Sequence, residues 1–233
     1  MSAAPGPGRG TAAPTRWRVV LPVKGGPTAK SRLGGEAAAR GELALAMAMD
    51  CLEAVLRTPG VERAVVVTGD AEVGRRAHGV GAVVVVPSSP VGHRTPLDAA
   101  VADGVRAAAG GQLDGAGTGV AVLLADLPAL DPVELARALA EAAGALADGA
   151  CAALLPDAEG SGTALLAAAG PEGLRTAYGA GSAERHEALG ARRLAPVPDL
   201  PTVRRDVDTP ADLQAARRLG LGRRTRALLG VGA

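Results

Sequence analysis

Two lysines lie six residues apart in a short glycine-rich segment. Of the 25 basic residues in the chain, only Lys24 and Lys30 are lysines, and Gly25 and Gly26 lie between them. Glycine lets a backbone approach a ligand closely, and a compact ammonium group suits phosphate. The neighbouring Ser31-Arg32 pair adds a hydroxyl and a third positive charge. The segment predicts a polyphosphate site, with a solvated basic loop as the alternative.

The Lys30-Ser31 pair superficially matches the end of a Walker A phosphate loop. That motif requires a glycine directly before the lysine and another glycine five residues before that one. The two positions hold Ala29 and Lys24 instead. A P-loop kinase is therefore disfavoured.

Aspartates at two places in the chain could hold a metal ion. Asp126 follows an apolar run, and Asp206 opens the segment Asp-Val-Asp-Thr-Pro. Mg²⁺ typically takes one or two protein carboxylates together with substrate phosphates. Asp126 could instead cap the next turn, and Asp208 or Thr209 is well placed to cap the helix that follows. No such structural role is evident for Asp206.

Two clusters of glycine and hydroxyl residues could bind an anion. They are Gly160–Thr163 and Tyr178–Ser182, and the second opens an expected helix. Successive backbone N–H groups in such turns form anion-binding nests, although two ordinary turns are an equal alternative. His186 follows Ser182 by one helical turn and could approach the same anion. The histidines lack metal-ligand spacing, and both cysteines are expected to be small core residues.

Apolar runs that alternate with helical patterns must position these residues. The expected strands are 16–23, 61–68, 81–86, 120–125, 150–155, 163–168 and 203–207, and the expected helices are 41–57, 71–78, 97–109, 132–146, 182–189 and 210–219. Continuously apolar strands alternating with helices predict a mostly parallel sheet covered on both faces. Ligands bind at the carboxyl ends of such strands. The segments 24–33, 87–96 and 126–128 should therefore form the site.

Composition excludes several classes of function. The chain has 233 residues and a net charge of +1, with one Trp, one Tyr and no Phe, which argues against nucleic-acid binding. Its apolar runs are too short to span a membrane, its first residues lack the apolar core of a signal peptide, and two cysteines give no disulfide framework. We expect a cytoplasmic protein with one folded domain over residues 16–220, a flexible tail over 1–15 and a tail over 221–233.

Five segments, in order along the chain, resemble one known family. They are Leu-Pro-Val-Lys with Ala-Lys-Ser-Arg-Leu, then Ala-Asp-Leu-Pro-Ala-Leu, Gly-Thr-Ala-Leu-Leu, Gly-Ser-Ala-Glu-Arg-His and Asp-Val-Asp-Thr-Pro-Ala-Asp-Leu. Together they span roughly residues 16 to 220 and resemble the CofC/FbiD guanylyltransferases of cofactor F-420 biosynthesis. The aspartate motifs are shared by the wider nucleotidyltransferase superfamily, whereas the Gly-Thr and Gly-Ser-Ala-x-Arg-His segments narrow the resemblance to this family.

The resemblance implies a fold, an activity and partners. The fold would be a Rossmann-like, GT-A-like nucleotidyltransferase sandwich of three layers, GTP the donor and Mg²⁺ the cofactor. The acceptor would be phosphoenolpyruvate, as in actinobacterial members, or 2-phospho-L-lactate, as in archaeal ones. The absence of Asn, Ile and Phe indicates a GC-rich genome and favours phosphoenolpyruvate. No nucleic acid or membrane is expected as a partner, and a homodimer stays open.

The resemblance also implies residue roles. Asp126 and Asp206 correspond to the metal carboxylates, and Thr163, Gly179 and Ser182 to the acceptor-binding positions. The catalytic positions are Lys24, Lys30 and Arg32, and the nucleotide-binding positions are Leu21, Lys24, Lys30, Ser31, Arg32 and Ser88. The chain departs from the family at Leu97-Asp98, where members often carry Leu-Asn, and at Ala125, where Gly is common.

The sequence leaves two other hypotheses about function open. Another nucleotidyltransferase of the same fold, acting on molybdopterin or a sugar phosphate, would use the same carboxylates with a larger acceptor pocket. A non-catalytic nucleotide-binding module would keep the lysine segment without needing Asp126 and Asp206 together.

Overall fold

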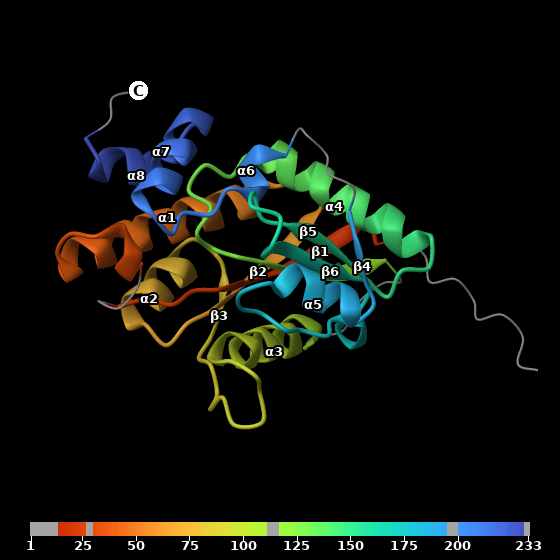
Figure 1. Ribbon diagram of the computed structural model, residues 1–233. Helices are drawn as coiled ribbons and strands as arrows, with labels where there is room; N and C mark the ends of the chain where they lie inside the picture. Colours follow the sequence, from red (N-terminus) through yellow and green to blue (C-terminus); the bar gives the residue numbers. More distant parts are fainter. Residues whose placement is uncertain (1–13, 27–29, 111–116, 195–199, 231–233) are drawn as a thin grey trace, which may run out of the picture.

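A single mixed sheet forms the centre of the molecule (Figure 1). The computed structural model describes residues 14–26, 30–110, 117–194 and 200–230. The sheet order is β3-β2-β1-β4-β6-β5-β7. The strands are β1 (Arg16–Pro22), β2 (Val61–Val67), β3 (Val83–Val85), β4 (Thr118–Leu123), β5 (Ala152–Pro156), β6 (Thr163–Ala168) and β7 (Ala191–Arg193).

The strand directions place four carboxyl ends at one edge. β1 pairs in parallel with β2 and β4, and β2 pairs in parallel with β3. β6 runs antiparallel to both β4 and β5, and β5 pairs in parallel with β7. The predicted mostly parallel α/β sheet is confirmed. Because β1 to β4 all point the same way, the loops that follow them converge, as the sequence predicts.

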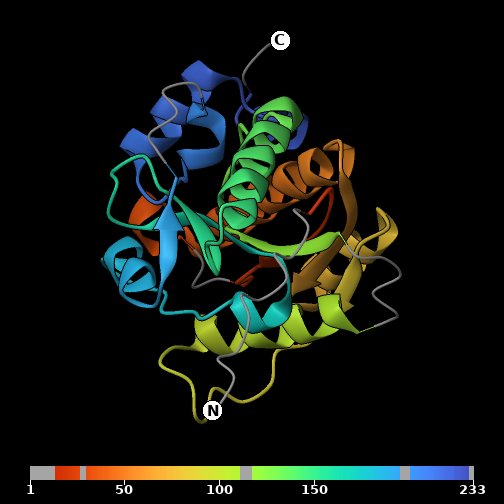
Figure 2. The same ribbon diagram turned by 90° about the vertical axis from the view of Figure 1, so that its right-hand side faces the viewer.

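Helices cover both faces of the sheet (Figure 2). The α-helices are α1 (Ala37–Arg57), α2 (Ala71–Gly79), α3 (Pro96–Ala109), α4 (Pro132–Ala147), α5 (Ser182–Ala188), α6 (Pro201–Arg204), α7 (Pro210–Leu219) and α8 (Arg223–Leu228), and the 3-10 helices are η1 (Ser31–Leu33) and η2 (Pro171–Gly173). Residues of α1, α2 and α4 share one apolar core, while α3 packs on the opposite face and α5 on that face beside it. The result is a three-layer sandwich.

The packing of the core on both faces of the sheet explains why the strand sequences are continuously apolar. In β1, Val19 and Leu21 belong to the core beneath α1 and α4, whereas Val20 between them packs with α3. All three side chains are fully buried. Successive residues of a strand point to opposite faces, so a strand covered on both sides must be apolar throughout.

Capping residues fix where several helices begin. Asp70 accepts hydrogen bonds from the backbone N–H groups at the start of α2, Thr95 does the same for α3, and Asp131 does so for α4. Thr209 and Asp212 form a reciprocal capping box at α7. Side-chain oxygens thus satisfy backbone donors that lack helical partners.

The end of the chain differs from expectation. The predicted strand over 203–207 is wrong, because Pro201 starts the short helix α6 instead. Thr202 of this helix donates from both its backbone N–H and its hydroxyl to Glu134 of α4, at 2.8 and 2.7 Å. These two bonds dock the start of the segment on α4.

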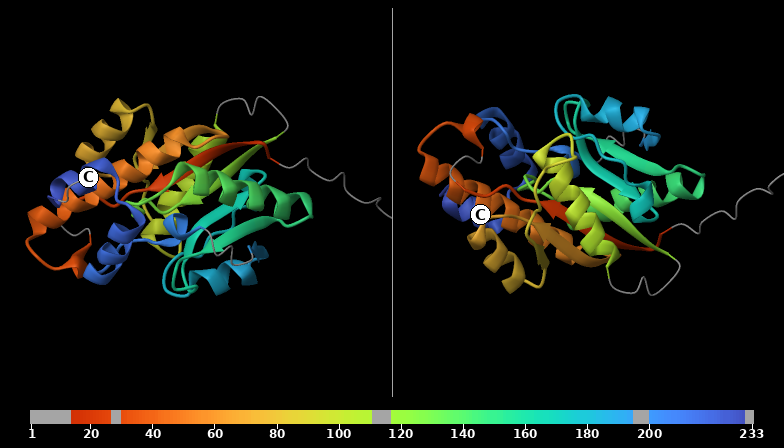
Figure 3. Two further views of the ribbon diagram at one scale, coloured as in Figure 1. Left: turned by 90° about the horizontal axis from the view of Figure 1, so that it is seen from above. Right: turned by 90° about the horizontal axis from the view of Figure 1, so that it is seen from below.

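The residues beyond Leu219 also form a helix. Asp50 of α1 accepts from the backbone N–H groups of Arg224 and Thr225, at 3.0 and 2.8 Å, and so holds the start of α8 on α1 (Figure 3). The sequence interpretation left residues 221–233 as a tail, but 223–228 pack on α1. Residues 1–13 and 231–233 lie outside the described residues. No helix in the described ranges has the length and apolar character needed to cross a bilayer.

The two cysteines have different environments. Cys51 is fully buried, and burial raises the pKa of its thiol well above the usual range, as expected of a core residue. Cys151 is exposed, so the expectation of a core position is wrong for it. It lies just before β5, outside the sandwich core.

Candidate active site

A cavity of about 800 Å³ opens at the carboxyl edge of the parallel strands. The segments after β1, β3 and β4 all line it, as the sequence predicts. The loop after β2 (Thr68–Asp70) lines it too, which was not predicted. Asp208, which precedes α7, also lines the cavity. Part of the wall is apolar, and its residues are Pro90 after β3, Pro96, Leu97 and Ala100 in the first turns of α3, and Ala44 and Ala48 of α1.

Lys30 joins two acidic segments at one side of this cavity. Its Nζ donates to Asp126 Oδ2 and, at 2.7 Å, to Asp208 Oδ1. The lysine side chain is only 13% exposed. Burial by itself disfavours the ammonium ion, but the two carboxylates outweigh it and raise the pKa of Lys30 above its ordinary value. Lys30 therefore stays charged across the physiological range.

A third carboxylate belongs to the same group. The Val207 N–H donates to the Asp126 backbone oxygen at 3.0 Å, so Asp206 lies next in chain to a residue tied to Asp126. Burial, followed by the nearby charges of Asp126 and Asp208, raises the pKa of Asp206 to about 7. Asp126 and Asp208 pair with the Lys30 ammonium and Asp206 lies near them, so the surplus of carboxylates over lysine favours binding of a further cation.

One oxygen of Asp126 fits a metal ion. Asp126 Oδ1 is buried and has no hydrogen-bond partner among the described residues. A buried carboxylate oxygen without a partner is costly, so a bound cation would compensate for it. Within the described parts of the chain, no three Asp, Glu, His or Cys side chains form a group able to hold a metal ion. Substrate oxygens would have to complete the coordination, as they commonly do for Mg²⁺.

The backbone at Lys30 and at Gly25 has features that shape this side of the cavity. Among the described residues, Lys30 is the single non-glycine residue with a positive φ, at 52°. Such strain at a functional side chain persists where surrounding contacts hold it, here the two ion pairs. Gly25 permits a close approach, because a Cβ at this position would lie 2.3 Å from Asp70 Oδ2.

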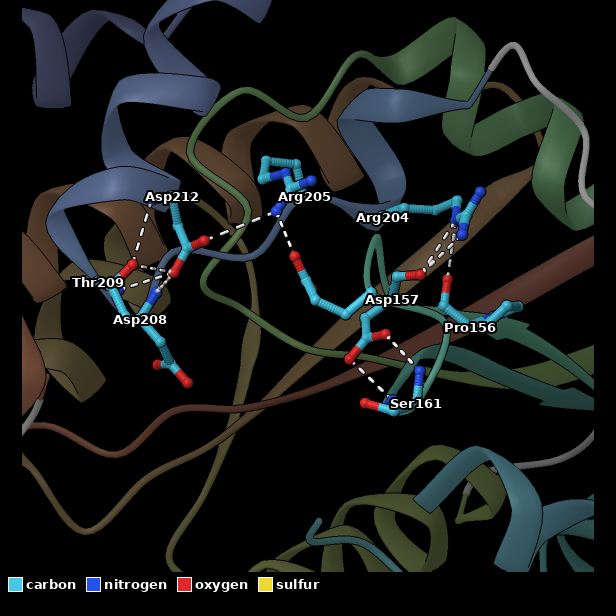
Figure 4. Close-up of polar contacts among 10 residues, drawn as sticks. Pro156, Asp157, Ser161, Arg204, Arg205, Asp208, Thr209 and Asp212 are labelled. Atoms are coloured by element: carbon cyan, nitrogen blue, oxygen red, sulfur yellow. Dashed lines mark hydrogen bonds and ion pairs between the residues drawn. The ribbon is translucent and has the colours of Figure 1, made fainter. Parts of the chain in front are cut away.

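Arginines next to Asp206 hold its segment in place (Figure 4). Arg204 Nη2 donates to the backbone oxygen of Asp157 at 2.8 Å, and the Arg204 backbone oxygen accepts from Ala158. Arg205 Nη1 donates to Glu159 at 2.6 Å and lies 3.6 Å from Asp212. The segment that carries Asp206 is therefore fixed between α7 and the loop joining β5 to β6.

The same loop reaches the proposed acceptor residues. Asp157 accepts from the backbone N–H groups of Ser161 and Gly162, at 3.0 and 2.8 Å, which folds the loop directly before β6 (Figure 4). The backbone oxygen of Ser161 accepts from Ala183 of α5 at 3.0 Å. One loop thus links Thr163 at the start of β6, Ser182 at the start of α5 and the Asp206 segment.

Thr163 and Ser182 lie in a buried polar cluster. Ser182 Oγ donates to Thr163 Oγ1 at 3.2 Å, and Thr163 Oγ1 is 2.9 Å from His186 Nδ1. Each of the three side chains is at most 2% exposed. The sequence interpretation placed His186 near the anion itself, whereas the imidazole contacts the Thr163 hydroxyl from the protein interior.

Two solved enzyme structures have folds similar to that of this chain. A crystal structure of 4-diphosphocytidyl-2C-methyl-D-erythritol synthase matches with a TM-score of 0.55 at 18% identity, covering 88% of this chain and 98% of the other. CMP:2-keto-3-deoxy-manno-octonic acid synthetase in complex with CTP matches with a TM-score of 0.53 at 16% identity, with the same coverage. These likenesses establish the Rossmann-like nucleotidyltransferase fold.

Curated sequences are far more similar. Phosphoenolpyruvate guanylyltransferase of Salinispora arenicola is 44% identical over 219 residues, which cover 93% of this chain and 95% of that protein. The enzyme of the same name from Streptomyces avermitilis is 45% identical over 214 residues, or 91% and 93% of the two chains. The chain belongs to the phosphoenolpyruvate guanylyltransferase family. No protein-family model matches it.

The guanylyltransferase residues expected from the sequence fall into three groups. Lys24, Lys30, Ser88 and Asp126 line the cavity, and Asp206 lies beside Asp126. Ser31 and Arg32 are exposed on η1, next to the cavity but outside its lining. Leu21 is buried in the core, and the two residues that follow it, Pro22 and Val23, line the cavity wall. Thr163 and Ser182 are buried outside the cavity lining, and Gly179 is exposed.

Two carboxylates of the site were not predicted from the sequence. Asp208 pairs with Lys30. The sequence suggested Asp208 or Thr209 as the cap of the helix that follows, and Thr209 has that role at α7. Asp70 lines the cavity and caps α2 at the same time. A capping pattern directly after the β2 run was a signal that could have identified Asp70.

Asp98 of this guanylyltransferase, which replaces the usual Asn, is occupied by protein contacts. Its Oδ1 accepts from the Tyr178 N–H at 2.9 Å and its Oδ2 from the Thr95 hydroxyl at 2.8 Å. The side chain is 2% exposed. Asp98 therefore ties the start of α3 to the segment that leads into Gly179.

Proposed function

We propose that the chain transfers GMP from GTP to phosphoenolpyruvate, giving enolpyruvyl-2-diphospho-5'-guanosine and pyrophosphate. The observation that carries the proposal is the meeting of Lys30 with Asp126 and Asp208 at a nucleotide-sized cavity, in a chain whose curated relatives bear this activity in their names. Pockets for nucleotide-sized ligands usually have volumes of roughly 300–1,000 Å³. The proposal includes a cytoplasmic location, where both substrates would have to be available.

The two ends of the cavity suit different parts of GTP. Lys24 and Lys30 line one side, where their charges can bind the triphosphate, and Arg32 lies next to them on η1. Ser88 and the apolar start of α3 line another part, which suits a base. The Ser88 N–H donates to Asp103 at 2.6 Å, so the loop after β3 is held on α3.

Asp126 and Asp206 are the residues that would hold Mg²⁺. Asp126 Oδ1 is a buried oxygen without a described partner, and Asp206 lies in the same negative field. A bound magnesium ion would neutralise phosphate charge and orient the reacting oxygens. Lys30, which donates to Asp126 and Asp208, and the Val207 backbone bond hold together the two segments that carry these carboxylates.

The reaction needs positioning more than proton transfer. A phosphate oxygen of the acceptor attacks the α-phosphorus in line, and pyrophosphate leaves. This oxygen is already ionised, so no general base is required. The lysines and Arg32 would stabilise the charge that develops on the leaving pyrophosphate, and Thr163, Gly179 and Ser182 would hold the acceptor.

Pyrophosphate release by the purified protein tests the proposal. GTP and Mg²⁺ would be supplied with phosphoenolpyruvate or with 2-phospho-L-lactate, and parallel reactions would replace GTP by ATP or CTP, or omit the metal. We expect release that needs phosphoenolpyruvate, GTP and the metal together. A higher rate with the lactate would change the acceptor, and GTP binding without release on either acid would contradict the activity.

A further inference from the structure

His186 is a buried histidine whose two ring nitrogens both have partners. Its Nε2 accepts from the Ala177 backbone N–H at 2.9 Å, and its Nδ1 lies 2.9 Å from Thr163 Oγ1. The side chain has no exposed surface, and the ring of Tyr178 packs edge-on against it at 4.9 Å between centroids. None of the proposed roles in binding or chemistry uses this residue.

The backbone contact determines where the imidazole proton lies. An amide N–H can only donate, so Nε2 must be unprotonated. In the neutral ring the proton is then on Nδ1, which donates to the Thr163 hydroxyl. In a protonated ring, the Nε2–H group would face the Ala177 N–H, so two donors would meet without an acceptor. Burial lowers the pKa of His186 to about 4, outweighing the nearby Asp98 carboxylate, which raises it, while Arg185 also lowers it.

The direction of this bond fixes the hydroxyls beyond it. Thr163 Oγ1 and Ser182 Oγ share one further hydrogen bond. Two hydroxyls have two hydrogens, and their mutual bond uses one of them whichever way it runs. Because Nδ1–H supplies the hydrogen of the bond between His186 and Thr163, that bond uses neither hydroxyl hydrogen. One hydroxyl hydrogen of the pair therefore has no acceptor among the described residues.

We propose that His186 is a positioning residue for acceptor binding: it directs the Thr163–Ser182 hydroxyl pair so that one O–H is available to an anionic oxygen of the acceptor. The inference rests on the proposed function, which assigns these two residues to the acceptor. An ionised carboxylate or phosphate group accepts hydrogen bonds and does not donate them, so the remaining hydroxyl donor matches it. An unprotonated Nδ1 would instead draw a hydroxyl hydrogen inward.

The surrounding bonds separate this role from general support of the fold. Ala177 and Tyr178 lead into Gly179, and the Tyr178 N–H is held independently by Asp98. Arg185 Nε donates to the Ala177 backbone oxygen at 2.9 Å. The backbone therefore has other restraints besides His186, whereas the bond to Thr163 is a separate contact that can be removed by itself.

A matched pair of substitutions tests the Thr163 bond. In His186→Gln the amide oxygen can replace Nε2 as the acceptor for Ala177, but no group replaces Nδ1–H. In His186→Asn the amide nitrogen lies near the Nδ1 position and can donate to Thr163. We expect His186→Gln to raise the KM for phosphoenolpyruvate about tenfold and that for GTP less than twofold. His186→Asn should restore most of the loss.

A double-mutant cycle with Thr163→Val provides the decisive comparison. If His186 acts through the hydroxyl, His186→Gln should change the acceptor KM little once that hydroxyl is gone. An equal effect in both backgrounds, or equal rises in both KM values, would overturn the inference. The folded fraction of every variant, measured by circular dichroism, corrects the rates for loss of structure.

The tautomer can be measured without any assay of activity. The chain has three histidines, so ¹⁵N labelling and NMR can assign each ring. We expect His186 to be neutral and protonated at Nδ1 at pH 7. Protonation at Nε2 would overturn the inference even in an active enzyme. An Nδ1-protonated ring in a protein without turnover would support the hydrogen-bond direction and contradict the proposed function.

Discussion

The Val207 N–H donates to the Asp126 backbone oxygen at 3.0 Å. This bond aligns the segment that carries Asp206 and Asp208 with the loop after β4. Asp126 and Asp208 then both pair with the Lys30 ammonium. A main-chain hydrogen bond in a buried position is expensive to leave unmade, so it fixes the acidic group independently of any ligand.

Replacement of Asp126 should abolish turnover. Asp126→Asn keeps the shape of the side chain but weakens metal binding and the pairing with Lys30, so we expect kcat to fall by on the order of a thousandfold or more. Asp148→Asn is the matched control, since the Asp148 side chain is 76% exposed. Near-normal pyrophosphate release by Asp126→Asn would contradict the assignment.

Lys30 should not be replaceable by arginine. The planar guanidinium is larger than an ammonium ion and cannot occupy the same position between Asp126 and Asp208. We expect both Lys30→Arg and Lys30→Gln to lower kcat/KM for GTP by about a hundredfold. Arg75→Gln, at a side chain that is 73% exposed, is the control. Full activity of Lys30→Arg in steady-state assays would show that only the charge matters.

Ser182 should affect the acceptor more than the nucleotide. Ser182→Ala removes one member of the hydroxyl pair while leaving the α5 backbone in place, so the KM for phosphoenolpyruvate should rise more than the KM for GTP. Steady-state kinetics with each substrate varied in turn would measure both constants. The opposite ranking would assign Ser182 to the nucleotide side.

His186 should make stability depend on pH below neutrality. Its folded-state pKa, about 4, lies below the ordinary value of 6.5. Between these values the unfolded chain binds a proton that the folded chain does not, so stability rises with pH. The contribution is complete above pH 6.5 and is lost progressively as the pH falls toward 4.

Urea unfolding at pH values from 4 to 7 measures this dependence. His186→Gln cannot titrate and should have a flatter profile than the wild type, by a few kcal/mol across the range. His93→Gln, at an exposed histidine, should keep the wild-type slope. Identical slopes for wild type and His186→Gln would contradict the prediction.

Gly25 should not tolerate a side chain. A Cβ would lie 2.3–2.5 Å from side-chain atoms of Asp70, which caps α2 and lines the cavity. Gly25→Ala should therefore cost about 1–3 kcal/mol of stability and weaken GTP binding. Gly79→Ala is the control, because no atom lies within 4 Å of its added Cβ. Calorimetry and GTP titration would compare the two variants.

The amino-acid sequence by itself determined the elements and the edge of the sheet where the site lies. Apolar runs such as β1 and β4 and caps such as Asp131 are local patterns, so they predict strands and helix starts without knowledge of the fold. The order of motifs also indicated the family that the relatives confirm. The 203–207 segment was mispredicted because Thr202, directly before it, contacts Glu134 of a helix distant in sequence.

Only the tertiary structure decided which side chains meet. Lys30, Asp126 and Asp208 belong to three separate segments, and their contact depends on the strand order and on the Val207 backbone bond. The tautomer of His186 on α5 likewise depends on the Ala177 N–H and on Thr163, which is at the start of β6. Sequence patterns report periodicity along the chain, whereas these contacts depend on distances across it.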